Sequence, residues 1–249
     1  MRILFVRLAK IRSAFQQNGF KNALSKLMQD GLLFFKGSLA YKKSGQVLLI
    51  SGGAGDSARY RTFNVAEDLR LRKVSALAVN QSNLWLKFLI GNFSIIVFHH
   101  RVIHNKKLEK ILRIAQRLNK KIVFDTDDLV LNREQWEKTE YYQQADQEER
   151  KQYQQSVGEY FLKHIPLAAI TVSTRYLAQK LKAVSTVSTY VVPNKINQQE
   201  VRWAETVLIS RNKSQKSSEE IKLGYFSGTL SHNRDFATIT NVLKKLLKK

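Results

Sequence analysis

The sequence predicts an α/β protein with a doubly wound, mostly parallel sheet of the Rossmann type and the beginning of a second lobe. Between residues 46 and 193, short apolar runs alternate with segments of helical periodicity. Several of these runs end in glycine, histidine or aspartate, as do strands whose carboxyl ends hold a ligand. Near the end of the chain another strand-like run, residues 221–226, meets the small-residue loop Ser227-Gly228-Thr229.

The first 45 residues are predicted to form a basic amphipathic helical segment. Leu4, Leu8, Ile11 and Phe15 recur at the spacing of one helical face, and the segment carries nine lysines and arginines against a single acid, Asp30. Such a helix is typical of proteins that lie on an anionic membrane surface. A helical hairpin packed on the main domain is the alternative.

Six apolar runs of the length of buried strands follow. They span residues 46–51, 74–79, 94–100, 121–125, 168–173 and 189–193. Helices are expected over about 58–72 and 105–119, within the glutamine-rich stretch 134–163, and up to about residue 182. We therefore predict a first lobe over 46–193, an interlobe linker over the polar residues 194–220, and the first strand–helix unit of a second lobe over 221–249.

The composition restricts the partners of the chain. A formal net charge of +22 implies an anionic partner: a nucleic acid, an anionic membrane or a phosphorylated ligand. Tyr141, Tyr142 and Tyr153 are not interleaved with lysine or arginine as stacking platforms usually are, so we expect no nucleic-acid partner. The sequence has no cysteine, which fits a reducing compartment, and we find no secretory segment or membrane span in it.

The first strand is followed by a glycine-rich loop with the sequence GGAGDSARYR. Gly52, Gly53 and Gly55 would let backbone N–H groups approach a ligand closely, and the next helix N-terminus would favour an anion. Arg59 and Arg61 add positive charge and bidentate hydrogen-bonding capacity. The loop is neither GxGxxG nor a P-loop, so a tight strand–helix turn with surface arginines is the alternative.

The third strand ends in FHHR, which places His99, His100 and Arg101 at the edge of the sheet where ligands bind. We expect no metal there, because adjacent histidines usually point apart and no carboxylate sits at ligand spacing in the sequence. Substrate binding or proton transfer by one histidine is a candidate role. Structural or surface histidines are the alternative.

The fourth strand ends in FDTDD, with Asp125 at its terminus and Asp127 and Asp128 in the following loop. These carboxylates could bind a divalent cation, accept hydrogen bonds from substrate hydroxyls, or cap the next helix. We favour hydroxyl binding or loop architecture over a metal, because the sequence shows no second carboxylate or histidine cluster beside them.

The loop after residues 221–226 has the features of a phosphate-contacting turn. Gly228 allows close backbone approach, Thr229 can donate a hydrogen bond, and Arg234 lies near the start of a helix. An ordinary strand–helix turn is the alternative.

The chain resembles a group 1 glycosyltransferase of the GT-B fold, the retaining class that uses sugar nucleotides. The resemblance covers residues 46–249 and rests on six motifs, which are in order GDSARYR, FHHR, FDTDD, TVSTRYLAQKL, VVPN and IKLGYFSGTLSHNRDF. FDTDD followed by YFSGT is more specific than either motif alone.

The resemblance implies two Rossmann-like lobes that face a cleft, the first binding a glycan or lipid-linked acceptor and the second a nucleotide-sugar donor. It places Gly52, Gly53, Gly55, Arg59, Arg101, Asp125, Asp127 and Asp128 on the acceptor side, and Gly228, Thr229 and Arg234 at the donor diphosphate. His100 and Asp127 are the candidates for catalysis. No metal and no cofactor besides the donor substrate are implied, because basic side chains and helix dipoles stabilise the leaving diphosphate in this fold.

The chain departs from the family in its donor lobe. The family carries a spaced pair of glutamates that contact the sugar and the ribose, whereas Asp235 is the only acid after Glu220. We therefore expect a truncated donor lobe and no activity from this chain alone. The chain is then a truncated gene product, one half of a split gene whose partner chain supplies the missing lobe, or part of a longer sequence.

The expected function is transfer of a sugar from a nucleotide-sugar to a lipid-linked or cell-envelope polysaccharide acceptor. The expected location is the cytoplasm, with the basic N-terminal segment docking at the inner face of the plasma membrane. The alternative is a non-catalytic module, derived from a glycosyltransferase lobe, that binds a membrane or a partner protein.

Overall fold

The structure is a computed structural model of the 249-residue chain. It describes residues 44–53, 56–129, 158–214 and 233–247, with a few single positions between these ranges. Nearly all of the expected N-terminal helical segment lies outside the described residues. The chain divides into two compact units, of which the first takes residues up to 128 and 156–195, and the second takes 129–155 and 196–249.

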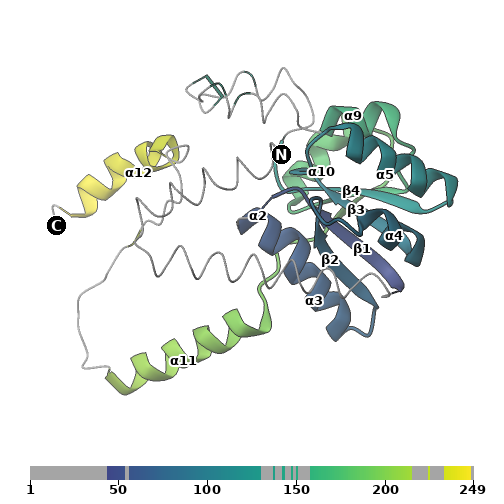
Figure 1. The fold of residues 1–249 in the computed structure, drawn as a ribbon. Helices are drawn as coiled ribbons and strands as arrows, with labels where there is room; N and C mark the ends of the chain where they lie inside the picture. Colours follow the sequence, from purple (N-terminus) through teal and green to yellow (C-terminus); the bar gives the residue numbers. More distant parts are fainter. Residues whose placement is uncertain are drawn as a thin grey trace. The chain divides into compact units, whose positions relative to one another are not determined.

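The first unit is organised around a six-stranded sheet (Figure 1). Its strands are β1 (Gly45–Ser51), β2 (Ala76–Asn80), β3 (Phe93–His99), β4 (Lys121–Thr126), β5 (Ala169–Val172) and β6 (Thr189–Val191). Every neighbouring pair is parallel, in the order β2-β1-β3-β4-β5-β6. The predicted α/β class with a parallel, Rossmann-like sheet is confirmed, and each strand coincides with one of the six apolar runs.

Helices connect the strands. The first connection is a continuous helical run, made of α2 (Asp56–Ala58), the wider π-type stretch η2 (Arg59–Phe63) and α3 (Asn64–Leu71), where one helix was expected. The later connections contain α5 (Lys106–Arg117), α9 (Gly158–His164) and α10 (Arg175–Lys182). Between β2 and β3 lie α4 (Leu86–Leu89) and the 3₁₀ turn η3 (Ile90–Asn92), which the sequence reasoning missed.

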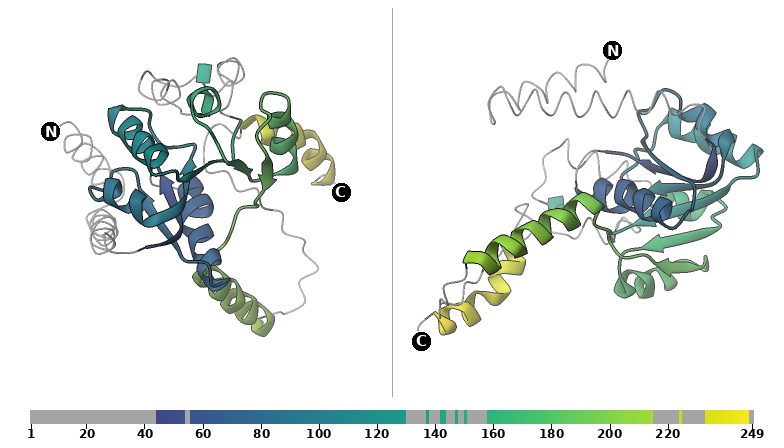
Figure 2. Two further views of the ribbon diagram at one scale, coloured as in Figure 1. Left: turned by 90° about the vertical axis from the view of Figure 1, so that its right-hand side faces the viewer. Right: turned by 90° about the horizontal axis from the view of Figure 1, so that it is seen from below.

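The sheet is covered on both faces (Figures 1 and 2). Val47 and Leu49 of β1 pack with Ala66 of α3 on one face. Because side chains alternate along a strand, Leu48 and Ile50 face the other side, in register with Ile96 and Phe98 of β3. There Phe161 of α9 packs against Phe98, with ring centroids 5.3 Å apart. Helices on opposite faces make the sheet doubly wound, as predicted.

The strand order places a topological switch point between β1 and β3. The chain runs from β1 to β2 on one side and then returns to β3 on the other side of β1. Connections from β1 and β3 therefore leave in opposite directions at the carboxyl edge. In open α/β sheets, ligands bind at such a topological switch point.

The second unit contains two described helices, α11 (Gln198–Ser214) and α12 (Asn233–Leu246). Residues 198–214 were expected as part of a linker, and they are helical. Both helices expose large apolar side chains: Trp203, Val207, Leu208 and Ile209 on α11, and Phe236, Ile239, Val242 and Leu246 on α12. Among the described residues, no helix combines the length and apolarity needed to cross a lipid bilayer.

Candidate functional site

Four polar side chains meet at the switch point between β1 and β3. His99 ends β3 and His100 follows it, Ser57 lies in α2 after β1, and Asp127 follows β4. His99 is in register with Asp125, so both project towards the face covered by the helical run 56–71. Asp127 comes two residues after Asp125, at the loop that leaves this edge. The sheet register therefore brings together side chains that are far apart in sequence.

Asp127 is the centre of this cluster. Its two carboxylate oxygens each lie 3.0 Å from the Ser57 hydroxyl, which donates to them. Its Oδ1 lies 3.3 Å from Nδ1 of His100 and 3.6 Å from Nε2 of His99. The same His99 nitrogen lies 3.2 Å from the Ser57 hydroxyl. The two imidazole rings are close neighbours, with centroids 4.3 Å apart.

Burial divides the cluster into a covered part and an accessible part. His99 and His100 are only 1% and 2% exposed, whereas the Asp127 side chain is 17% exposed. A ligand that approaches this edge of the sheet would therefore meet the Asp127 carboxylate before either imidazole.

The surroundings also set the charges of the cluster. Burial lowers the pKa of His100 well below its usual range, and the neighbouring His99 acts in the same direction against the attraction of Asp127. Burial by itself raises the pKa of Asp127, but the neighbouring imidazoles of His99 and His100 and the hydrogen bond from Ser57 outweigh it and hold this pKa well below the usual range. Near neutral pH, the cluster consists of an ionised carboxylate beside a neutral His100.

The histidine geometry contradicts one step of the sequence reasoning. The adjacent histidines do not point apart, and a carboxylate does lie within ligand distance of both of them. The reason is that β3 ends at His99, so strand alternation no longer governs His100, which begins a turn. In the part of the chain that the structure describes, neither ring nitrogen of His100 has a hydrogen-bond partner, and His99 Nδ1 has none.

Asp125 has a structural role rather than the ligand-facing one that the resemblance implied. It is 4% exposed and forms a buried ion pair with Arg61, whose Nε donates to it at 3.1 Å and whose Nη2 makes a second contact. The Thr171 hydroxyl donates to the same carboxylate at 2.6 Å. Nη1 of Arg61 reaches the Val192 carbonyl and, at 3.4 Å, the Asn194 side chain. This pair ties the first connection to β4, β5 and the exit of β6.

Gly52 and Gly53 of the first loop differ in the space around them. A Cβ on Gly52 would lie 1.6 Å from the carbonyl oxygen of Arg101, so the loops after β1 and β3 pack backbone against backbone here. Gly52 is required for that approach, and its place on the acceptor side of the lobe stays a prediction. A Cβ on Gly53 would meet nothing within 4 Å.

The remaining predicted site residues lie apart from the cluster. Arg59 is exposed and stacks over the ring of Tyr60, to whose hydroxyl it donates at 2.7 Å. Arg101 and Asp128 are exposed at the rim. Gly55, Gly228 and Thr229 are outside the described residues, and so is the side chain of Arg234 at the start of α12.

Three contributors were missed as site residues. The sequence reasoning assigned no site role to the side chains of Ser57 and Thr171, and Arg61 was expected either to add charge to a ligand-binding loop or to lie on the surface. A usable signal existed for Arg61 and Thr171, because both face a strand that ends in an acid, and a buried acid in a parallel sheet requires a partner. No sequence signal would have linked Ser57 to Asp127, since their proximity depends on the order of the strands.

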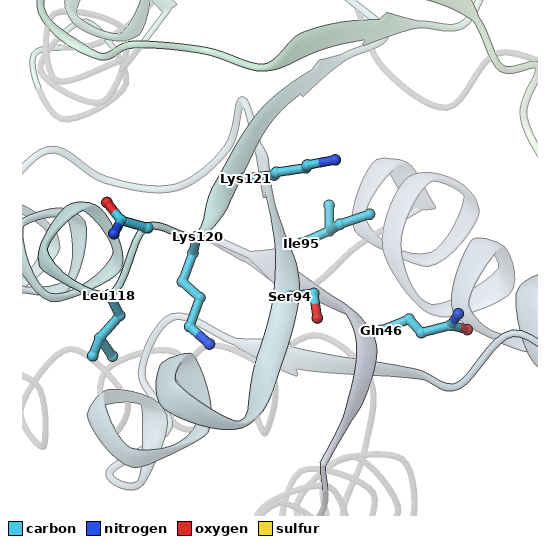
Figure 3. A pocket seen from close by; sticks show the side chains of 7 residues that line it. Gln46, Ser94, Ile95, Leu118, Lys120 and Lys121 are labelled. Carbon is cyan, nitrogen blue, oxygen red and sulfur yellow. The ribbon is translucent and has the colours of Figure 1, made fainter.

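A hollow of about 390 Å³ lies at the opposite edge of the sheet (Figure 3). Its lining comes from the amino-terminal ends of the strands and the α5–β4 turn: Gln46, Ser94, Ile95, Leu118, Asn119, Lys120 and Lys121. Lys120 donates to the Gly91 carbonyl at 2.8 Å. The hollow is separated from the Asp127 cluster by the length of the strands, and the residues of the sequence motifs do not line it.

Comparison with known proteins adds little to this geometry. The sequence matches no protein-family profile and no curated protein. Among solved structures, a protein from Listeria monocytogenes assigned as a sugar-phosphate isomerase is similar, with 16% identity and a TM-score of 0.25. The match covers 49% of this chain and 63% of that one. A likeness at this TM-score carries no argument about function.

Proposed function

We propose that the chain belongs to a sugar-nucleotide-dependent glycosyltransferase of the GT-B type, and that its parallel sheet forms the acceptor-binding lobe. One observation carries the proposal: Ser57, His99, His100 and Asp127 meet at the β1/β3 switch point. These residues come from three motifs, GDSARYR, FHHR and FDTDD, on which the resemblance to that family rests. Ligands of open α/β sheets bind at such a crevice.

Asp127 is the group that would touch the acceptor. An ionised carboxylate accepts hydrogen bonds from sugar hydroxyls, and Asp127 is more accessible than either imidazole of the cluster. His100, the other candidate for catalysis, is almost fully buried behind it and would act through the carboxylate as a positioning residue. The sugar would come from a nucleotide-sugar donor held by a second lobe that includes α12.

Histidine imidazole signals in NMR spectra provide the test. The chain has five histidines, so His104 and His164 serve as internal controls for His99 and His100. We expect n-octyl β-D-glucoside, used as an acceptor mimic, to shift the signals of His99 and His100 but not those of the controls. The same titration with UDP-glucose and GDP-mannose tests for donor binding. The test measures binding rather than sugar transfer, because the sequence after residue 220 lacks the spaced glutamate pair that contacts the sugar and the ribose in the family it resembles.

Two variants sharpen this test. Asp127→Asn should weaken glycoside binding at least about tenfold, as expected for a lost charged hydrogen bond. Glu159→Gln, which changes a half-exposed carboxylate of α9 that pairs with Lys163 outside the cluster, should leave binding within about twofold. Glycoside binding that is equal in both variants, or the absence of any saccharide effect on His99 and His100, would contradict the proposal.

A specific observation also favours the non-catalytic alternative. The exposed apolar side chains of α11 and α12, such as Trp203 and Phe236, are of the kind that bind a partner or a membrane surface. In that case the lobe would serve as a docking module, and sugars would not affect the cluster.

A further inference from the structure

We infer that His99, His100 and Asp127 form a binding site for one divalent transition-metal ion of the zinc class. The inference does not depend on the proposed glycosyl transfer, because it rests on the donor atoms and their spacing alone.

The donor set is the first argument. Two imidazoles and one carboxylate are the protein ligands of many zinc sites that keep a fourth position open, and imidazole nitrogens favour zinc and its neighbours over magnesium or calcium. One potential ligand atom from each residue lies within 4.8 Å of the others. Among the described residues, His99, His100 and Asp127 form the one group of three potential metal ligands at such distances.

The spacing of these atoms is the second argument. Two ligands on a tetrahedral zinc ion, with bonds of about 2.0–2.1 Å, lie about 3.3 Å apart. Asp127 Oδ1 is 3.3 Å from His100 Nδ1 and 3.6 Å from His99 Nε2. These two separations fit a single tetrahedral ion, whereas the separation between the two imidazole nitrogens, at most 4.8 Å, would have to shorten by up to about 1.5 Å for the ion to bind all three atoms.

The third argument is the hydrogen bonding of His100. Its side chain is 2% exposed, and its Nδ1 faces Asp127 without the geometry of a hydrogen bond. A buried polar group without a partner is rare in proteins, and a metal ion supplies the missing interaction. The Ser57 hydroxyl, which donates to the carboxylate at 3.0 Å, is placed to orient Asp127 as an outer-shell partner.

Metal titration of the untagged protein tests the inference. Co²⁺ serves as the visible probe and Zn²⁺ as the competitor. We expect one equivalent of Co²⁺ to produce ligand-field absorption, and Zn²⁺ to displace it. His100→Gln and Asp127→Asn should each weaken Zn²⁺ binding at least about tenfold.

His104→Gln is the matched control, because His104 also lies beside a carboxylate, with its Nε2 3.2 Å from Glu109, but outside the cluster. This variant should bind Zn²⁺ as the unmodified protein does. Circular dichroism will verify that each variant is folded. If a cluster variant does not fold, His99→Gln, which removes the third ligand of the proposed site, is tested in its place. Two results would overturn the inference. One is a Co²⁺ titration that gives no ligand-field absorption band, and the other is full Zn²⁺ affinity in the cluster variants.

Discussion

At the scale of single residues, Arg61 is a buried cation that joins separate parts of the first unit. Its guanidinium is fully buried, and its partners belong to β4 and to the segment after β6. Removing one member of such a pair leaves the other charge buried and uncompensated, which costs far more than the pair contributes. The Asp125 carboxylate is further held by Thr171. Stability, rather than ligand binding, is therefore the property that these residues control.

Replacing Arg61 by methionine should lower the free energy of unfolding by about 3–5 kcal/mol, because the Asp125 carboxylate would remain buried without its cation. Urea denaturation measures this loss. Arg72→Met is the matched control, since Arg72 pairs with Asp68 at 3.2 Å but its side chain is 67% exposed. That control should cost less than about 1 kcal/mol. Equal losses of unfolding free energy in the two variants would show that the buried pair stabilises the fold no more than the exposed pair does.

At the scale of elements, the close approach of the loops after β1 and β3 shapes the crevice. Gly52 lies against the backbone of Arg101, and the Ser51 hydroxyl donates to the Gly53 carbonyl at 3.1 Å. The first loop therefore turns next to the carboxyl end of β3, where His99 and His100 lie. Since β1 and β3 are adjacent strands, both loops are held by the same part of the sheet.

Substitution of Gly52 by alanine should destabilise the protein by more than about 2 kcal/mol, because backbone atoms cannot move aside as a flexible side chain can. Gly53→Ala, one position further, should change stability by less than about 0.5 kcal/mol, because its Cβ would point into open space. Thermal unfolding of the two variants makes the comparison. A well-tolerated Gly52→Ala would mean that the two loops lie further apart than described.

At the scale of the whole molecule, charge is the dominant property. The chain carries 42 lysines and arginines against 20 acids. Much of this excess lies at the two ends of the sequence, whereas the cluster in the sheet contains the ionised Asp127. We therefore expect attraction to anionic surfaces to be a property of the chain outside the Asp127 cluster.

The protein should co-sediment with vesicles that contain acidic phospholipid at low salt, and high salt should release it from them. The physical reason is that salt shortens the Debye length from about 30 Å at 0.01 M to about 3 Å at 1 M. Neutral vesicles provide the control, and Asp127→Asn should bind vesicles like the unmodified chain. Binding that is indifferent to acidic lipid would exclude an electrostatic membrane partner.

The sequence by itself determined the class of the fold and the positions of its strands. Each strand is a local apolar run, and local periodicity is sufficient to recognise it, as the runs that became β1 to β6 show. The sequence also placed FHHR and FDTDD correctly at strand ends. It could not assign α4 or the helical state of 198–214, because neither has a strong periodic pattern.

Only the tertiary structure decided what the strand-end residues do. The order β2-β1-β3-β4 sets which loops are neighbours, and it depends on pairing between segments distant in the chain. That order buries Asp125 against Arg61 and leaves Asp127, two residues later, beside Ser57, His99 and His100. Two aspartates of one motif thus lie in different surroundings, because the sheet register and the helix above it, rather than the motif, determine which carboxylate meets an arginine.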